Sequence, residues 1–376
     1  MKRLLPLLIV LLLYGCSSVS NPEAAVNSLQ AKAGVSDAQL ETVFHRLSYF
    51  PNGTQFSLAL INDGPPVFYG ALRENDTLKT IKNSGRAFEI GSISKVFTST
   101  LLAEMASAGT LALSDPVQQY LDFPLNDSLP ITFAQLSSHT SGLPRLPSGF
   151  LWESLWNMNN PYKNYGETKL KAYLQQEMEI ENEPGSSFRY SNIGAGILGY
   201  VLTQIENKSY ESLLQEKIFL PYEMHASTTE RKRVEEILVG GLDKGGDSTS
   251  NWDLAALPGA GAILSTAEDM SKFMAANFDP DNKALRLQRE QVYKVNDKTD
   301  MALGWFIIRE DSTTSWYWHN GGTGGYRSSL VLDIDRRRGA LVLSNISAGH
   351  SHAAGIDSLS FSLMEDFPVP EVTSTN

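Results

Sequence analysis

Residues 88–97 read Phe88-Glu89-Ile90-Gly91-Ser92-Ile93-Ser94-Lys95-Val96-Phe97, and the rest of the chain is organised around this stretch. Apolar residues follow it at helical spacing as far as Met105, and Gly109 is expected to end the helix. Ser92 and Lys95 are three residues apart, so they are expected to share one helix face. A serine becomes a nucleophile when a neighbouring base takes its proton. Burial of this helix would lower the pKa of Lys95 and make it such a base.

The Ser-x-x-Lys pair is a weak pattern when taken alone, because short patterns of this kind also arise by chance. Lys95 is nevertheless the only lysine of the sequence with a serine three residues before it. A catalytic interpretation therefore depends on what the rest of the chain supplies.

The composition is that of an acidic globular protein. The chain has 376 residues, of which 42% are hydrophobic and 10% aromatic, enough for one large domain or two ordinary ones. Its formal net charge is −11 and its pI is about 5.1. No basic face is expected on such a protein, which argues against a nucleic-acid partner.

The N-terminus has the pattern of an export signal. Met1-Lys2-Arg3 precedes an apolar run at 4–13 that is too short to span a bilayer. Leu13-Tyr14-Gly15-Cys16 then resembles a bacterial lipoprotein signal, in which cleavage leaves Cys16 as the lipid-bearing N-terminus. We therefore expect a signal peptide at 1–15 and a small, polar tether at 16–35.

This signal predicts a cell-envelope protein, anchored by a lipid on Cys16 to a bacterial membrane and facing the periplasm or the exterior. The alternative is an ordinary secretory signal with an incidental cysteine, which also places the protein outside the cytoplasm. Cys16 is the only cysteine, so the sequence allows no intrachain disulfide and no multi-thiolate metal site.

The pattern after the tether predicts strands at both ends of the chain and helices between them. Strand-like runs cover 56–61, 67–72, 303–309, 314–318, 328–334 and 340–345. Helical stretches cover 36–47, 167–178, 192–205, 210–219, 265–277 and 352–365, with capping-box spacing at Ser36 and Ser265.

This order of elements predicts an α+β fold at 36–366. We expect an antiparallel sheet built from both chain ends and flanked by helices, with a helical lobe at about 96–260 and a tail at 367–376. An active site is expected between the sheet and the lobe.

A second candidate motif is Tyr190-Ser191-Asn192, where a glycine- and serine-rich turn becomes a helix. A tyrosine near a lysine can act as a base or relay a proton, and an amide can orient both the lysine and a substrate carbonyl. Tyr162-Lys163-Asn164 has the same pattern but falls in 145–166, a stretch expected to be a long ordered loop. Tyr190 is therefore preferred, and Tyr162 is expected to pack or to line a cleft.

The third motif is the stretch Trp318-His319-Asn320-Gly321-Gly322-Thr323-Gly324-Gly325-Tyr326, between two strand-like runs. So many glycines let a substrate lie against bare backbone, whose free amides can hold a developing oxyanion. The alternative is a glycine-rich hairpin with a packed histidine. It is not a phosphate loop, because no helix with Lys-Ser/Thr follows.

In their order and spacing, Ser92-Ile93-Ser94-Lys95, Tyr190-Ser191-Asn192 and His319-Asn320-Gly321 resemble the three motifs of the class C β-lactamase-like serine hydrolases. This superfamily includes β-lactamases, D-alanyl-D-alanine peptidases and esterases. Residues 139–144 and 259–270 also resemble recurrent stretches of the family. The likeness covers about 36–366 and implies a β-lactamase/transpeptidase-like fold.

The resemblance implies a role for each matching residue. Ser92 would be the acylated nucleophile, while Lys95 and Tyr190 would share proton transfer. Backbone amides of Ser92 and Gly322 would form the oxyanion hole. The residues expected to bind substrate are Asn192, which would also position the lysine, and His319, Asn320, Gly321 and Gly322. No metal or other cofactor is implied.

Two positions of the third motif depart from the family pattern. His319 stands where typical penicillin-recognising enzymes have lysine, and Asn320 where they have serine or threonine. A neutral imidazole is a weaker carboxylate partner than an ammonium, which disfavours efficient β-lactam recognition. A histidine at this position is similar to some peptidase and esterase branches of the family.

The leading hypothesis is an acyl-enzyme serine hydrolase of the cell envelope that cleaves an amide or ester, of the β-lactam or D-Ala-D-Ala peptide type. A carboxylesterase on the same fold is the first alternative. The second is a catalytically inactive, penicillin-binding-type fold that serves as a binding or sensor module. The sequence leaves open the physiological substrate, the oligomeric state and whether Lys95 or Tyr190 is the general base.

Overall fold

The computed structural model describes residues 23–127, 129–311 and 314–367. The predicted signal peptide, Cys16 and nearly all of the predicted tail lie outside these described residues. Within them, no helix combines the length and the apolar character that crossing a membrane would require.

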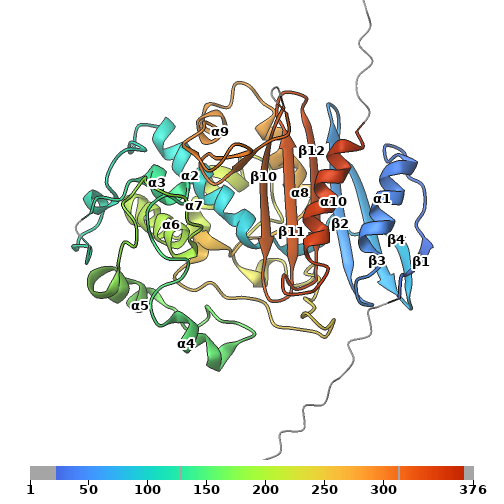
Figure 1. The fold of residues 1–376 in the computed structure, drawn as a ribbon, viewed down its shortest axis with the longest axis horizontal. Coiled ribbons are helices and arrows are strands. Elements are labelled where there is room, and N and C mark those ends of the chain that lie inside the picture. The colour runs from blue at the N-terminus through green and yellow to red at the C-terminus, as the bar shows by residue number, and fades with distance from the viewer. Residues whose placement is uncertain (1–22, 128, 312–313, 368–376) are drawn as a thin grey trace, which may run out of the picture.

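A ten-stranded sheet forms one half of the molecule (Figure 1). Its strands, from edge to edge, are β1 (Val26–Ser28), β4 (Thr77–Ile81), β3 (Val67–Glu74), β2 (Gln55–Asn62), β12 (Arg338–Ser344), β11 (Arg327–Asp333), β10 (Ser315–Gly322), β9 (Phe306–Arg309), β8 (Thr299–Met301) and β7 (Tyr293–Lys294). All neighbours pair antiparallel except β1 and β4, so the sheet is mixed. The prediction of a sheet built from both chain ends is confirmed, because β2 from the N-terminal part pairs directly with β12.

Helices cover both faces of this sheet. Helices α10 (Ala354–Glu365) and α1 (Asp37–Leu47) pack together on one face (Figure 1). Helix α8 (Ala267–Asn277) packs on β2 and β12 from the other face. The alternation of β12 reflects this, since Val342 belongs to the core beneath α10 and Leu341 to the core beneath α8. Every residue of β12 is accordingly buried.

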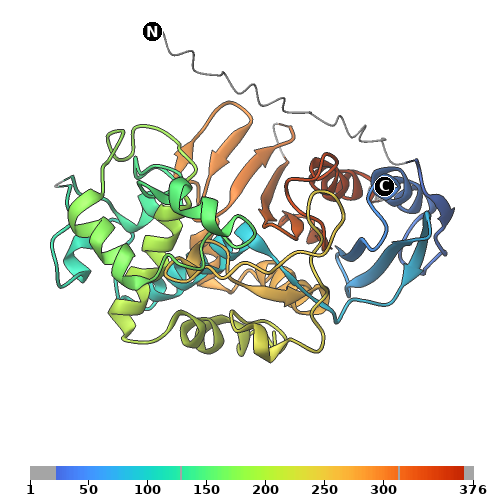
Figure 2. The same cartoon turned by 90° about the horizontal axis from the view of Figure 1, so that it is seen from below.

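The remaining helices form a lobe beside the sheet, as Figure 2 shows from a second direction. They are α2 (Ser94–Ser107), α3 (Phe133–Ser137), α4 (Phe150–Ser154), α5 (Glu167–Ala172), α6 (Asn192–Glu206), α7 (Tyr210–Leu214) and α9 (Lys283–Gln288), with π-helical turns at Tyr173–Glu177 and Gln215–Phe219. Most of α2 is buried, including the polar residues of its first turns. A helix buried on nearly all sides lies in the interior, where a lysine at its start loses contact with water.

Several local features differ from the sequence predictions. Val26–Ser28 forms β1 inside the stretch expected to be a tether, because its backbone pairs with β4. A short two-stranded sheet, β5 (Ala87–Glu89) with β6 (Leu264–Thr266), was not predicted; strands this short carry little periodic pattern. Residues expected to form a long loop contain α4 and a 3-10 turn at Leu155–Asn157.

The helix caps were predicted correctly in one case and misplaced in the other. Ser36 caps α1 through the predicted capping box with Gln39. The second box was wrong by one residue: Thr266, not Ser265, caps α8, and its side chain accepts from the backbone of Asp269. Ser265 instead lies in β6, and its side chain is hydrogen-bonded to Ser227.

Candidate active site

Glycines let strand β10 of the sheet approach Ser92 closely. Ser92 lies in a 3-10 turn, Gly91–Ile93, directly before α2. Gly91 has a positive φ of 52°, and a Cβ on it would lie 2.5 Å from the backbone nitrogen of Gly322. A Cβ on Gly321 would lie 1.9 Å from the carbonyl oxygen of Ile90. Only glycine fits such contacts, so strand β10 passes directly beside the serine.

Lys95 lies buried in the first turn of α2, with its amine beside the serine hydroxyl. Nζ is 3.0 Å from Oγ of Ser92 and donates to the carbonyl oxygen of Ala260 at 2.6 Å. Burial, and secondarily the positive charge of Arg145, hold the pKa of Lys95 well below its ordinary value. A neutral amine within hydrogen-bond distance of a hydroxyl has the geometry of a general base.

Tyr190 completes the contact with Ser92 from the lobe. Its phenol is hydrogen-bonded to the Ser92 side chain, and its ring centroid lies 5.0 Å from Nζ of Lys95. Burial raises the pKa of Tyr190 to about 12, although the bond to Ser92 and the charge of Arg145 act in the opposite direction. The phenol is therefore protonated at neutral pH and suits a donor or relay better than a base.

The stretch 139–144 holds Tyr190 in place. His139, at a φ of 60°, accepts a hydrogen bond from the backbone of Ser191 through Nδ1, and its ring centroid is 4.4 Å from that of Tyr190. Ser191 in turn caps α6 and donates to the carbonyl of Pro144 at 2.6 Å. This recurrent stretch therefore serves as a support for the tyrosine.

Asn192 begins α6 and points to Tyr162 rather than to Lys95. Its Nδ2 donates to the hydroxyl of Tyr162 at 3.0 Å, while its Oδ1 is buried without a partner among the described residues. An unpaired carbonyl oxygen beside Ser92 is suited to accept from a substrate amide. Tyr162, the alternative to Tyr190 in the sequence, lines the same pocket as Ser92 and Asn192. This agrees with the prediction that Tyr162 packs or lines a cleft.

On the sheet side, His319 and Asn320 point in opposite directions, as successive strand residues do. The His319 ring faces Tyr190, with 6.3 Å between centroids, and burial lowers the pKa of His319 to about 3. Asn320 instead donates to Asp357 of α10 at 2.9 Å. Asp357 also pairs with Arg327. The structure thus brings His319, but not the side chain of Asn320, to the reacting groups.

The pocket at Ser92 is narrow, with a volume of about 20 Å³, little more than a water molecule occupies. A larger pocket of about 380 Å³ adjoins it. Trp252, Leu254 and Gly261 line both pockets. Sequence reasoning missed Trp252, because it lies far from all three motifs along the chain.

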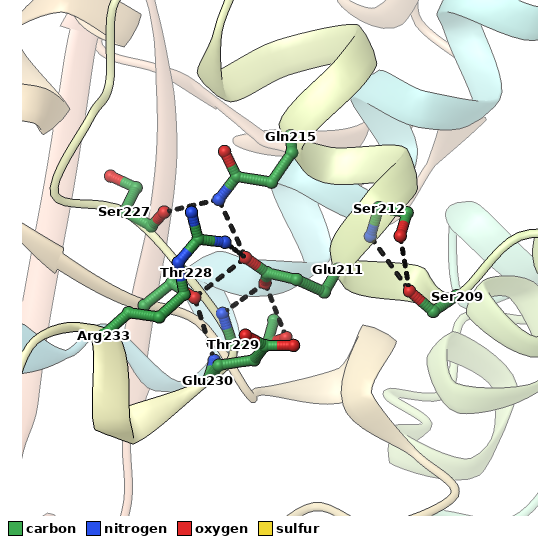
Figure 3. A network of polar contacts seen from close by, with 9 residues as sticks. All are labelled: Ser209, Glu211, Ser212, Gln215, Ser227, Thr228, Thr229, Glu230 and Arg233. Carbon is green, nitrogen blue, oxygen red and sulfur yellow. Dashed lines mark hydrogen bonds and ion pairs between the residues drawn. The ribbon is translucent and has the colours of Figure 1, made fainter.

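A polar network surrounds Glu211 beside the larger pocket, and Figure 3 shows the residues of the network. The Glu211 carboxylate accepts from the backbone and hydroxyl of Thr229, from Thr228 and Gln215, and from the guanidinium of Arg233. Burial alone would raise the pKa of Glu211, but these hydrogen bonds outweigh it and lower the pKa. Thr229 lines the pocket directly, so the network holds its wall in place.

The described residues contain no group of three or more His, Cys, Asp or Glu side chains able to hold a metal ion. The hydroxyl of Ser92, an amine with a lowered pKa, a protonated phenol and the glycines of β10 meet at one point. Such a set can accept an acyl group on the serine and move one proton between the oxygen and a leaving group.

The comparisons with known proteins agree with this arrangement. Residues 54–361 match the model of the Beta-lactamase family, so the chain belongs to this family, whose members include serine hydrolases. The chain is 28% identical over 327 residues to the D-alanyl-D-alanine-carboxypeptidase/endopeptidase AmpH of Escherichia coli K12, covering 78% of this chain and 80% of that protein.

More distant relatives share the fold. Penicillin-binding protein 4* of Bacillus subtilis is 25% identical over 298 residues, covering 74% of this chain and 64% of its own length. The crystal structure of a β-lactamase/D-alanine carboxypeptidase from Pseudomonas syringae superposes with a TM-score of 0.71 at 19% identity, covering 88% of this chain and 98% of that one. The predicted β-lactamase/transpeptidase-like fold is confirmed.

Proposed function

We propose that this protein is an acyl-enzyme serine hydrolase of the bacterial cell envelope that cleaves peptides ending in D-Ala-D-Ala. The observation that carries the proposal is the 3.0 Å approach of the buried Lys95 amine to the Ser92 hydroxyl. The carboxypeptidase/endopeptidase named as its relative in Escherichia coli supports this choice of substrate. The lipid anchor on Cys16 and the location at a membrane belong to the same proposal.

In the acylation step, Ser92 Oγ attacks the substrate carbonyl carbon while its proton passes to Lys95. The oxygen of the tetrahedral intermediate is held by the backbone amides of Ser92 and Gly322. The C–N bond then breaks, and the leaving amine takes the proton through the Tyr190 hydroxyl. Water hydrolyses the acyl-enzyme in the second half of the cycle and restores the serine.

Lys95, rather than Tyr190, is the base in this scheme. The two pKa shifts support that assignment, because the lysine is shifted toward its neutral form and the tyrosine away from its phenolate. Asn192 Oδ1 accepts from the substrate amide N–H, and His319 packs beside Tyr190 as a neutral ring.

The second candidate is a carboxylesterase on the same site. One observation favours it: the neutral imidazole of His319 occupies the position expected to attract a substrate carboxylate. Turnover of nitrocefin, an N-acyl-D-Ala-D-Ala peptide and a p-nitrophenyl ester separates a β-lactamase, a peptidase and an esterase. We expect D-alanine release from the peptide, and ester turnover without peptide turnover would favour the esterase.

The test of the shared chemistry is intact-mass detection of a covalent adduct on Ser92 after treatment with a fluorophosphonate or a β-lactam. The wild-type protein is expected to gain the mass of the adduct, and Ser92→Ala is expected to gain none. No adduct with any of these reagents would support an inactive binding or sensor module instead.

A further inference from the structure

A peptide that ends in D-Ala-D-Ala presents a free carboxylate, and the sheet side of the site offers no available cation for it among the described residues. His319 is neutral, with a pKa lowered to about 3 by its burial. Arg327, the nearest guanidinium on β11, is paired with Asp357 and mostly buried. The partner for a carboxylate must therefore come from elsewhere.

The lobe side supplies one. Arg145 is exposed, its Cζ lies 5.2 Å from the ring centroid of Tyr190, and no carboxylate of the described residues forms an ion pair with it. Its charge also acts on the pKa of a group in the site. After burial, the charge of Arg145 is the next cause that lowers the pKa of Lys95.

The backbone fixes where this side chain begins. The carbonyl oxygen of Arg145 accepts from the backbone nitrogens of Asn192 at 2.9 Å and Ile193 at 3.3 Å. Arg145 is thus tied to the start of α6, two residues from Tyr190. These two backbone hydrogen bonds fix the position of the Arg145 backbone beside Tyr190, which a loop without such bonds would not do.

We propose that Arg145 binds the free C-terminal carboxylate of the substrate and so sets the preference for acid over amide ends. The geometry points to this contact, because Arg145 Cζ lies 5.2 Å from the Tyr190 ring centroid and a terminal carboxylate carbon lies only about 2.5 Å from the leaving nitrogen. That nitrogen is the atom that Tyr190 protonates in the scheme above. A guanidinium beside the same phenol can pair with the carboxylate through two parallel N–H donors. The inference deepens the proposed function and rests on its D-Ala-D-Ala substrate.

The test compares two ligands that differ only at that end: an N-acyl-D-Ala-D-Ala peptide with a free carboxylate and the same peptide as its C-terminal amide. Turnover of both is measured in the wild type and in Arg145→Gln. Loss of Arg145 is expected to raise KM for the acid by about tenfold or more, since a bond to a charged group is lost. The kinetic constants for the amide peptide should change little. The ratio of kcat/KM for the acid to kcat/KM for the amide is therefore expected to fall.

The acid-to-amide ratio of kcat/KM is insensitive to a second effect of the Arg145→Gln substitution, which is a change in the pKa of Lys95. Arg145→Gln also alters the pKa of Lys95, but that alteration acts equally on both peptides and cancels. Arg145→Lys, which keeps the charge, should restore part of the acid preference. Arg189→Gln is the matched control, because Arg189 precedes Tyr190 but is paired with Glu181, and it should leave the ratio unchanged.

Binding measured in the Ser92→Ala background tests the inference without any turnover. The acid peptide should bind at least about tenfold more tightly than the amide, and Ser92→Ala/Arg145→Gln should lose that preference. Equal binding of the two peptides, or a preference that survives Arg145→Gln, would overturn the role of Arg145. Absence of a covalent adduct on the wild type would overturn the proposed hydrolase separately.

Discussion

The sheet wall and the lobe wall of the active site differ in whether they offer a cation that is not already paired. On the sheet wall, His319 is neutral and Arg327 is already paired with Asp357. On the lobe wall, burial lowers the pKa of Lys95 well below its ordinary value, and Arg145 forms no ion pair with a carboxylate of the described residues. In the proposed mechanism the two walls have different roles: strand β10 supplies backbone amides, and the lobe side supplies proton transfer and charge.

The largest expected effect follows from removing the base on the lobe wall. Lys95→Met replaces the amine with an apolar side chain of similar length, and acylation of Ser92 should slow by about 10³- to 10⁴-fold. The measurement is the rate of adduct formation by intact mass, with thermal unfolding as the control for folding. A folded Lys95→Met protein that acylates at nearly the wild-type rate would remove the lysine from the mechanism.

A smaller loss is expected at the phenol. Tyr190→Phe keeps the ring on which His139 and Arg145 pack and removes only the hydroxyl bonded to Ser92. Acylation by the peptide substrate should fall by about 10²-fold, because the leaving amine loses its proton donor. The effect on a p-nitrophenyl ester should be weaker, since nitrophenolate leaves without a proton. Equal losses for both substrates would argue against the proposed relay.

Tyr162→Phe distinguishes the two tyrosines that share the Tyr-x-Asn pattern. It removes only the hydroxyl that accepts from Asn192. A neutral hydrogen bond contributes about 0.5–1.5 kcal/mol, so kcat/KM should fall by only several-fold. A larger loss in Tyr162→Phe than in Tyr190→Phe would reverse their assigned roles.

The smallest effect concerns pH. The active form of Lys95 is the neutral amine, so the rate rises with pH as the lysine loses its proton. The charge of Arg145 favours that neutral form; removing it raises the pKa of Lys95 and moves the acid limb of kcat/KM to higher pH. A charge about 10 Å away in water shifts a pKa by about 0.3 unit. The acid limb of kcat/KM is therefore expected to move by about that amount in Arg145→Gln. A shift to lower pH would contradict the electrostatic role.

Much of this arrangement follows from local sequence patterns. The contact between Ser92 and Lys95 is set by a three-residue spacing at a helix start. The orientation of Asn320 was predicted wrongly: the predicted strand ended at 318 and both His319 and Asn320 were expected at the substrate, whereas β10 runs to Gly322 and its alternation turns Asn320 toward Asp357. Strands β2, β3, β11 and β12 were predicted close to their observed bounds, because their apolar runs are long.

The rest depends on contacts between residues far apart in the chain. Arg145 reaches the site because its carbonyl binds the start of α6, and Trp252 lines the pocket from a loop without a motif. The partner of Asn320 lies on α10, which only the packed sheet brings near. No spacing rule along one sequence encodes such pairings.

The central claim is that Lys95 is uncharged beside Ser92 at neutral pH. Titration of the protein labelled with ¹⁵N-lysine, followed by NMR, measures this directly, and Lys95→Met identifies the resonance by its absence. The Lys95 resonance should titrate with a midpoint well below the ordinary value of 10.5. A midpoint near 10.5 would mean that the amine is an ammonium in the folded protein and would contradict the proposed mechanism.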